Sequence, residues 1–251
     1  MIVGEIIMLE WFAAAIGPFH AVFGFIGLAA FWVPIFSKKG ARRHVAFGKI
    51  FLYCAYVVLG SAGISVIYHL VRLSLADRGP AMDPTFSFML FLGYLALVTL
   101  INVRHAIGVL RTKDVPDSLA TPLNILMGRL AIAASIGLIA FTVIVRPSVW
   151  ILLLALSPIG LGIGFGIGKY LSGNRPSQKQ WLYEHLGGMI GTGIAFHTAF
   201  AVFGSTQLFD YRFEGLLYVI PWIAPAMIGI PATVIWSRYY QRKFGELATA
   251  A

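Results

Sequence analysis

Seven long apolar runs follow one another along the sequence, separated by short segments that carry charged and turn-forming residues. Each run is close to the roughly 20 residues that an α-helix needs to cross the hydrocarbon core of a bilayer. The predicted spans are Leu9 to Phe36, Ala46 to Leu73, Phe86 to Leu110, Pro122 to Val145, Val149 to Leu171, Trp181 to Gly204 and Gly215 to Trp236. Because a helix satisfies its own backbone hydrogen bonds in lipid, the pattern predicts an all-α integral membrane protein, a seven-transmembrane helix bundle.

The composition excludes an ordinary soluble protein. Of the 251 residues, 59% are hydrophobic and 12% are charged, whereas a soluble domain has about half and about a quarter. The loops are short, so we expect a single transmembrane helical domain over residues 1–251, in contact with the lipid bilayer. The net charge of +9 does not indicate nucleic acid, because the basic residues are spread between the spans.

The distribution of Lys and Arg predicts how the bundle is oriented. The side with the first, third and fifth loops and the C-terminus carries fourteen of the 19, namely Lys38, Lys39, Arg42, Arg43, Lys49, Arg104, Arg111, Lys113, Lys169, Arg175, Lys179, Arg238, Arg242 and Lys243. The other side carries Arg72, Arg78, Arg146 and Arg212. Basic residues of short loops favour the cytoplasmic side, so the N-terminus is predicted outside and the C-terminus in the cytoplasm.

A five-residue signature, His-x-x-Phe-Gly, occurs on both of the first two spans. It runs from His20 to Gly24 on the first span and from His44 to Gly48 on the second, with a short basic turn between them. Residues four apart share a face of a helix, so each glycine leaves room beside its histidine for a flat ligand or a close helix. These four residues are therefore candidates for cofactor binding.

The six histidines fall at two predicted depths. Three lie near cytoplasmic ends of spans and three toward the outer side: His44, His105 and His185, and then His20, His69 and His197. Imidazoles on facing helices commonly hold a haem iron, so the leading hypothesis is haem b ligation for electron transfer, with a quinone, redox or membrane-protein partner. The spacing of His185 and His197 counts against haem, because these two histidines of one span lie about 120° apart around the helix. The alternative is that His44 and His69, which are about 37 Å apart along one helix, are simply interfacial.

The cytoplasmic group of histidines also predicts a metal site. His44, His105 and His185 with Glu184 supply three imidazoles and a carboxylate, which suits zinc or iron with an open position for water. Such a site implies an intramembrane hydrolase or a metal-dependent redox enzyme. The spacing counts against it, because the adjacent residues Glu184 and His185 diverge by about 100° around a helix.

The division of basic residues between the two sides leaves Arg129 inside its span, where it bears on every interpretation. An unpaired charge in the membrane is costly, so we expect Arg129 to face the interior and pair with Glu184, or to contact an anion such as a haem propionate. With the histidines, these residues can alternatively line the polar path of a transporter or channel-like protein. A third alternative is a non-catalytic membrane subunit whose glycine-rich faces dock a partner.

Glycine and proline shape the last three spans. Glycines alternate with large apolar residues from Gly160 to Gly168, and others lie between Gly187 and Gly193; both patterns predict close helix packing on small residues. The last span carries Pro221, Pro225 and Pro231, which remove backbone donors and predict kinks.

Two stretches are similar to a known kind of protein. The segment from His20 through Gly48 to about Gly60 resembles a family of predicted bacterial multi-pass membrane proteins that carry a domain of unknown function. In that family a first-helix histidine followed by glycine is joined by a short basic loop to a second-helix His-x-x-x-Gly. The run from Trp181 to Gly191 also resembles parts of uncharacterised membrane proteins. The resemblance implies the bacterial cytoplasmic (inner) membrane and carries no activity with it.

Overall fold

The computed structural model describes residues 2–75, 84–209 and 215–246, with side chains over 15–75, 84–206, 208–209 and 217–246. Every element within these ranges is a helix. The loops that carry Arg78 and Arg212 lie outside the described residues.

The seven predicted spans are confirmed as seven helical stretches long and apolar enough to cross a membrane. They are Ala15–Phe36, Arg42–Ser74, Pro84–Arg111, Pro122–Val145, Trp150–Leu171, Gln180–Gly204 and Leu217–Lys243. The second begins before its apolar run and the seventh continues past Trp236, because Arg and Lys are good helix formers whose charged ends reach the interface. The chain is thus of the multi-pass membrane type, while the orientation of its termini stays a prediction.

The helices group into two compact units. The first comprises residues 1–97 and 145–150, and the second comprises 98–144 and 151–251. Helix α3 (Pro84–Arg111) contributes its first half to one unit and its second half to the other. The single domain expected from the loop lengths stays a prediction.

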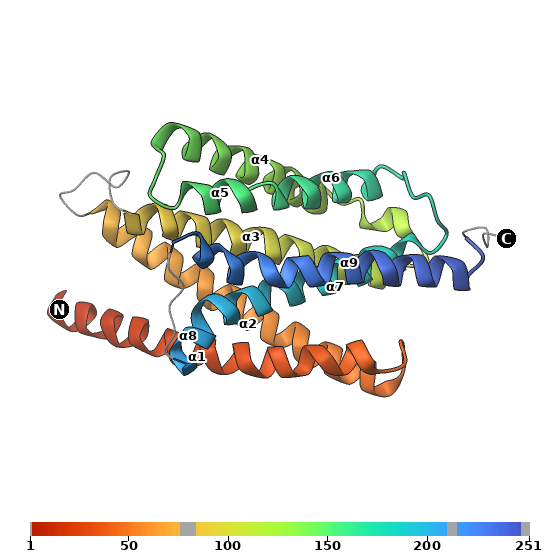
Figure 1. Cartoon of the computed structure of the whole chain (residues 1–251), viewed down its shortest axis with the longest axis horizontal. Coiled ribbons are helices and arrows are strands. Elements are labelled where there is room, and N and C mark those ends of the chain that lie inside the picture. Colours follow the sequence, from red (N-terminus) through yellow and green to blue (C-terminus); the bar gives the residue numbers. More distant parts are fainter. Residues whose placement is uncertain (1, 76–83, 210–214, 247–251) are drawn as a thin grey trace. The chain divides into compact units, whose positions relative to one another are not determined.

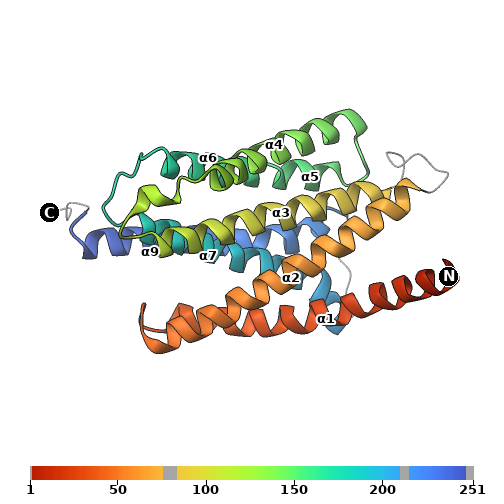
Figure 2. The ribbon, with the colours of Figure 1, turned by 180° about the vertical axis from the view of Figure 1, so that it is seen from behind.

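A helical hairpin forms most of the first unit. Helices α1 (Ile2–Phe36) and α2 (Arg42–Ser74) lie side by side in both ribbon views (Figures 1 and 2). The rings of Phe31 and Phe51 lie 5.3 Å apart between them. The chain reverses at Gly40, whose φ of 77° favours glycine. Lys39 Nζ donates to two carbonyls of the last turn of α1, at 2.7 and 2.9 Å, and so caps that helix.

Glycines bring α6 against α4 in the second unit. This unit contains η2 (Pro116–Leu119), α4 (Pro122–Val145), α5 (Trp150–Leu156), α6 (Ile159–Leu171), α7 (Gln180–Ala199), a π-helical segment η3 (Phe200–Gly204), α8 (Ser205–Phe209), η4 (Gly215–Val219) and α9 (Ile220–Lys243). A Cβ at Gly164 would lie 2.5 Å from the Gly128 carbonyl oxygen, and one at Gly160 would lie 2.7 Å from that of Ala131. Close packing on glycine is therefore confirmed for this face, whereas Gly162 and Gly166 have open space.

Helices α7 and α9 pack together along their lengths (Figures 1 and 2). A Cβ at Gly229 of α9 would lie 2.5 Å from the Ile194 side chain of α7. Pro225 and Pro231 lie inside α9 as expected. Pro221 was expected to kink the span but lies in the first turn, where its missing N–H removes no helical hydrogen bond.

A hydrogen-bonded carboxylate follows the end of α9. Glu246 accepts hydrogen bonds from Ser177 Oγ and Tyr183 Oη, both at 2.6 Å. The Lys179 ammonium lies 4.3 Å from the centre of the Phe244 ring. These contacts fix the C-terminal end of α9 to the start of α7.

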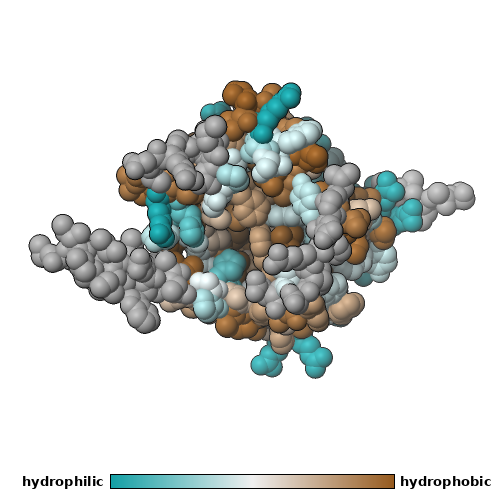
Figure 3. Space-filling view, turned by 60° about the vertical axis from the view of Figure 1, so that its left-hand side comes forward, coloured by the Kyte–Doolittle hydropathy of each residue, from teal (hydrophilic) through white to brown (hydrophobic). Residues whose placement is uncertain are grey.

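Large apolar side chains remain exposed on the spans. Ile144, Phe165 and Ile228 are examples, at 81%, 63% and 73% exposure. In Figure 3, hydrophobic (brown) residues lie on the surface and the hydrophilic (teal) ones form small separate groups. An exposed apolar surface of this kind fits contact with lipid chains.

Candidate functional site

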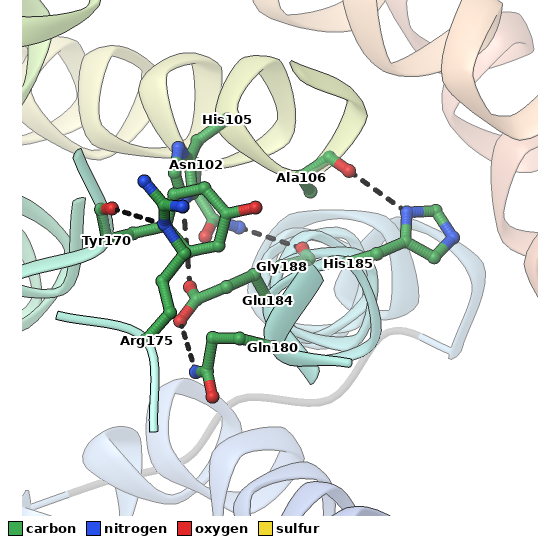
Figure 4. Close-up of polar contacts among 9 residues, drawn as sticks. All are labelled: Asn102, His105, Ala106, Tyr170, Arg175, Gln180, Glu184, His185 and Gly188. Atoms are coloured by element: carbon green, nitrogen blue, oxygen red, sulfur yellow. Dashed lines mark hydrogen bonds and ion pairs between the residues drawn. The ribbon is translucent and has the colours of Figure 1, made fainter. Parts of the chain in front are cut away.

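A polar cluster joins α3, α6 and α7 in the second unit. It consists of Asn102 and His105 on α3, Tyr170 on α6, and Gln180 and Glu184 on α7, and we call it the α3–α7 polar cluster (Figure 4). Its centre is the contact of His105 Nε2 with Glu184 Oε2 at 3.6 Å. The two side chains are 10% and 25% exposed. Two titratable groups thus face each other within predicted membrane spans.

The Glu184 carboxylate has one further partner on its own helix. Gln180 Nε2 donates to Glu184 Oε1 at 2.9 Å, a contact made possible by their spacing of one helical turn. The distance to His105 exceeds hydrogen-bond range, and none of the described residues hydrogen-bonds His105 Nε2. An imidazolium ring, protonated at both nitrogens, would form an ion pair with Glu184. An approach of about 0.8 Å would bring Nε2 and Oε2 to hydrogen-bond distance.

Tyr170 of α6 packs against the His105 ring. The two rings meet edge to face, with centres 5.5 Å apart. The Arg175 guanidinium lies 5.1 Å from the centre of the Tyr170 ring, its Nε donates to the Tyr170 carbonyl oxygen at 3.1 Å, and the same group pairs with Asp117. The tyrosine is buried against Val109 and Leu119. His105 is therefore held in a fixed position from the α6 side.

Asn102 links α3 to α7 one turn deeper in the span. Its Nδ2 donates to the Gly188 carbonyl oxygen at 2.8 Å and contacts Thr192 Oγ1 at 3.3 Å. The two helices approach closely here, because a Cβ at Gly188 would lie 2.5 Å from the Ala106 Cβ. Glu184, Gly188 and Thr192 follow one another at intervals of four residues, about one turn, so they share the face of α7 toward α3.

His185 lies on the other side of α7 from the Glu184 contact. Its Nδ1 donates to the Ala106 carbonyl oxygen at 3.0 Å, and Figure 4 shows the ring pointing away from His105. Of the four predicted metal ligands, the structure brings two together, His105 and Glu184. His185 points elsewhere, and His44 belongs to the first unit. Among the described residues, no group of three or more His, Cys, Asp or Glu side chains is placed to hold a metal ion.

The two copies of the His-x-x-Phe-Gly signature place their histidines alike. His20 Nδ1 bonds Ser61 Oγ of α2 at 2.9 Å. The serine hydroxyl itself donates to the Val58 carbonyl oxygen at 3.0 Å, so it accepts from the imidazole. His44 Nδ1 donates to the Pro34 carbonyl oxygen at 3.2 Å. In both copies the ring hydrogen-bonds a neighbouring helix through Nδ1.

The two glycines of this signature have different surroundings. A Cβ at Gly24 would have nothing within 4 Å, and one at Gly48 would only reach Pro34 Cγ, at 4.0 Å. Gly24 therefore leaves room beside its helix, as predicted, and no described helix lies close to it, whereas Gly48 faces α1 at an ordinary contact distance. Their role in cofactor binding stays a prediction.

The two remaining histidines make local contacts. His69 meets the neighbouring Tyr68 ring edge to face, with centres 5.4 Å apart. His197 Nδ1 donates to the Gly193 carbonyl oxygen one turn back, at 2.7 Å, just before α7 becomes π-helical at Phe200. The arrangement of the six histidines in two levels stays a prediction, because they are divided between the two units.

The predicted pairing of Arg129 with Glu184 is wrong. Arg129 is exposed on α4, while Glu184 contacts His105 and Gln180. The reason is the packing of α4 on α6. The preceding residue, Gly128, is buried against that helix and turns Arg129 about 100° away from the contact. Its expected contact with an anion stays a prediction.

Three members of the cluster were not foreseen from the sequence. Asn102 carried a signal, because a lone amide inside an apolar span usually bonds a neighbouring helix. Gln180 lies one turn before Glu184, which is also readable from the sequence. Nothing in the sequence marks Tyr170, whose place depends on how α6 packs.

Comparisons with protein-family models, with curated proteins and with solved structures find no match for this chain. The resemblance to a bacterial membrane-protein family therefore stays a prediction. The function has to be argued from the cluster itself.

Proposed function

We propose that this protein conducts protons along a polar path, with His105 and Glu184 as the proton-binding pair. The observation that carries the proposal is the 3.6 Å contact between these two mostly buried side chains inside predicted spans. Ionisable groups within membrane spans are energetically costly and commonly mark proton or solute pathways. Histidine changes its charge near neutral pH, which suits it to release as well as bind a proton.

The proton step needs only this pair. A proton from the water side binds His105 Nε2, and the Glu184 carboxylate stabilises the resulting charge. When the two atoms approach to hydrogen-bond distance, the proton passes from Nε2 to Oε2, which leaves both side chains neutral. Loss of that proton from Glu184 restores the starting state, so one proton enters for each that leaves.

The helices around the pair have features that permit bending. Helix α7 continues from His197 into a π-helical segment, Phe200–Gly204, and such segments often mark functional sites. Helix α9, packed on α7, contains Pro225 and Pro231, which remove two helical hydrogen bonds. A bend in α7 or α9 would alter access to Glu184, which favours transport over a rigid subunit.

Voltage-driven proton flux into liposomes tests the proposal. Purified protein is reconstituted with a trapped pH-sensitive dye, and a potassium gradient with valinomycin sets the potential. We expect acidification faster than in empty liposomes and reduced at least about tenfold in Glu184→Gln and in His105→Gln. The matched control is Asp114→Asn, an exposed carboxylate between two spans. Wild-type flux equal to that of empty liposomes contradicts the proposal.

We propose as a second candidate that the first unit binds haem b and transfers electrons, with a quinone or another redox partner. The observation that favours it is the Nδ1 hydrogen bond of both His20 and His44. Ligating histidines usually donate from the nitrogen that does not bind the metal, which fixes the ring. The ligand atom would be Nε2, beside a helix face that Gly24 leaves open.

Absorption spectra of the oxidised and dithionite-reduced protein separate the two candidates. After expression with haem precursor, the haem candidate predicts sharp reduced bands that are lost in His20→Ala or His44→Ala. Ser61→Ala, which removes only the Nδ1 partner of His20, should keep the bands and shift the midpoint potential. A colourless, folded preparation contradicts haem binding and leaves the proton proposal unaffected.

We also propose that the N-terminus lies outside and the C-terminus in the cytoplasm of a bacterial inner membrane. The support is the excess of basic residues on the predicted cytoplasmic side. This orientation places the α3–α7 polar cluster toward the cytoplasm, because His105 lies six residues before Arg111, at the end of α3.

A further inference from the structure

A basic pocket lies at the turn between α1 and α2, in the first unit. It has a volume of about 680 Å³, and its lining includes Trp32 and Phe36 of α1, Lys38 of the turn, and Arg42 and Arg43 of α2. No residue of the α3–α7 polar cluster lines it. The proton proposal therefore gives this pocket no role.

The positive charge of the pocket has no acidic neighbour in the sequence. Lys38, Arg42 and Arg43 are exposed, and no Asp or Glu occurs between Glu10 and Asp77. Among the described residues, none makes an ion pair with these three cations. The backbone adds to the charge, because Ala41 gives the first turn of α2 no side-chain cap and that end of a helix is partly positive.

An exposed aromatic wall adjoins these cations. The rings of Trp32 and Phe36 are stacked, with centres 5.8 Å apart and planes at 17°. They are 45% and 81% exposed. Tryptophan is enriched where membrane meets water, and α1 ends at Phe36, immediately before the basic turn. An occupant with negative charge at one end and an apolar chain at the other would complement both parts of the pocket.

We propose that this pocket binds an anionic phospholipid. The phosphate of the head group lies against Lys38, Arg42 and Arg43, and an acyl chain lies along Trp32 and Phe36. Basic pockets between transmembrane helices at a membrane surface are typical head-group sites. A free phosphate ion would match only the charge, whereas a phospholipid also has an acyl chain that can cover the exposed faces of Trp32 and Phe36.

Quenching of Trp32 fluorescence by brominated lipid tests the proposal. The protein is placed in nanodiscs of phosphatidylcholine that contain increasing fractions of brominated phosphatidylglycerol or, in a parallel series, of brominated phosphatidylcholine. Subtracting the signal of Trp32→Phe isolates the contribution of Trp32. We expect half-maximal quenching at a fraction of brominated phosphatidylglycerol about fivefold lower than that of brominated phosphatidylcholine. One basic residue near an anionic lipid contributes about that factor.

Two triple variants decide whether the pocket causes the preference. Lys38→Gln/Arg42→Gln/Arg43→Gln should quench equally with both lipids. The matched control, Arg238→Gln/Arg242→Gln/Lys243→Gln at the end of α9, should keep the preference. If the first variant does not fold, Arg42→Gln alone should reduce the preference at least twofold.

Three results would overturn the lipid site. Equal quenching of the wild type by both lipids would mean that no head group is selected. Equal loss in both triple variants would mean a general effect of surface charge. Loss of the preference on adding excess inorganic phosphate at constant ionic strength would mean that the pocket binds free phosphate.

Discussion

Gly188→Ala probes the closest approach of α3 and α7. The new methyl carbon would lie 2.5 Å from the Ala106 Cβ and 3.5 Å from its Cα. Neither atom belongs to a flexible side chain, so the two helices must separate by about 1 Å to reach an ordinary contact. Overpacking of this kind costs about 1–3 kcal/mol.

The same displacement strains two hydrogen bonds across the interface. Asn102 donates to the Gly188 carbonyl oxygen at 2.8 Å and His185 donates to that of Ala106 at 3.0 Å. An interhelical hydrogen bond in a membrane protein contributes about 0.6 kcal/mol. We therefore expect Gly188→Ala to lower the free energy of unfolding by about 2–4 kcal/mol.

Unfolding in increasing SDS, followed by circular dichroism, measures this change. The control is Gly24→Ala, where a Cβ meets nothing within 4 Å, so alanine should be neutral or slightly stabilising. Adding Ala106→Gly to Gly188→Ala removes the clashing carbon and should recover most of the loss. If Gly188→Ala is as stable as the wild type, or if the double variant recovers nothing, the proposed close contact is wrong.

Three further changes test other contacts. Gly164→Ala, which brings a Cβ to 2.5 Å from the Gly128 carbonyl oxygen, should lower unfolding stability by about 1–3 kcal/mol, whereas Gly162→Ala should not. Burial raises the pKa of Glu246, but the hydrogen bonds from Ser177, Tyr183 and the Lys179 backbone, with the charge of Lys179, together lower it more, so its net pKa is below the usual value. Its stabilisation is complete above the unfolded pKa near 4.5 and is lost as pH falls through the lowered pKa, so Glu246→Gln should flatten the acid side of a stability–pH curve. An alkaline phosphatase fused to the C-terminus should be inactive, and a fused fluorescent protein should be bright; the reverse contradicts the orientation.

The helices were readable from the sequence because lipid imposes a length and an apolar composition on every span. The apolar pattern did not predict where each helix begins and ends, or where a helix departs from α-helical geometry. Arg42 and Lys243 extend helices beyond the apolar runs. The π-helical segment at Phe200–Gly204 carries no polar signature that separates it from the rest of its span.

The site was only partly predictable because it depends on which helix faces meet. Glu184 and His105 were both candidates from the sequence, but Arg129 was expected as the partner of the carboxylate. Burial of the adjacent Gly128 against α6 decides which way Arg129 points. Without a structure, nothing distinguishes that glycine from others with open space beside them, such as Gly137.

A double-mutant cycle on proton flux tests the central claim most directly. It compares the wild type with His105→Gln, with Glu184→Gln and with the double variant in the same liposome assay. Because the two residues handle the same proton, we predict that the double variant is no slower than the slower single variant. Losses that multiply, or flux that neither substitution reduces, would contradict the account.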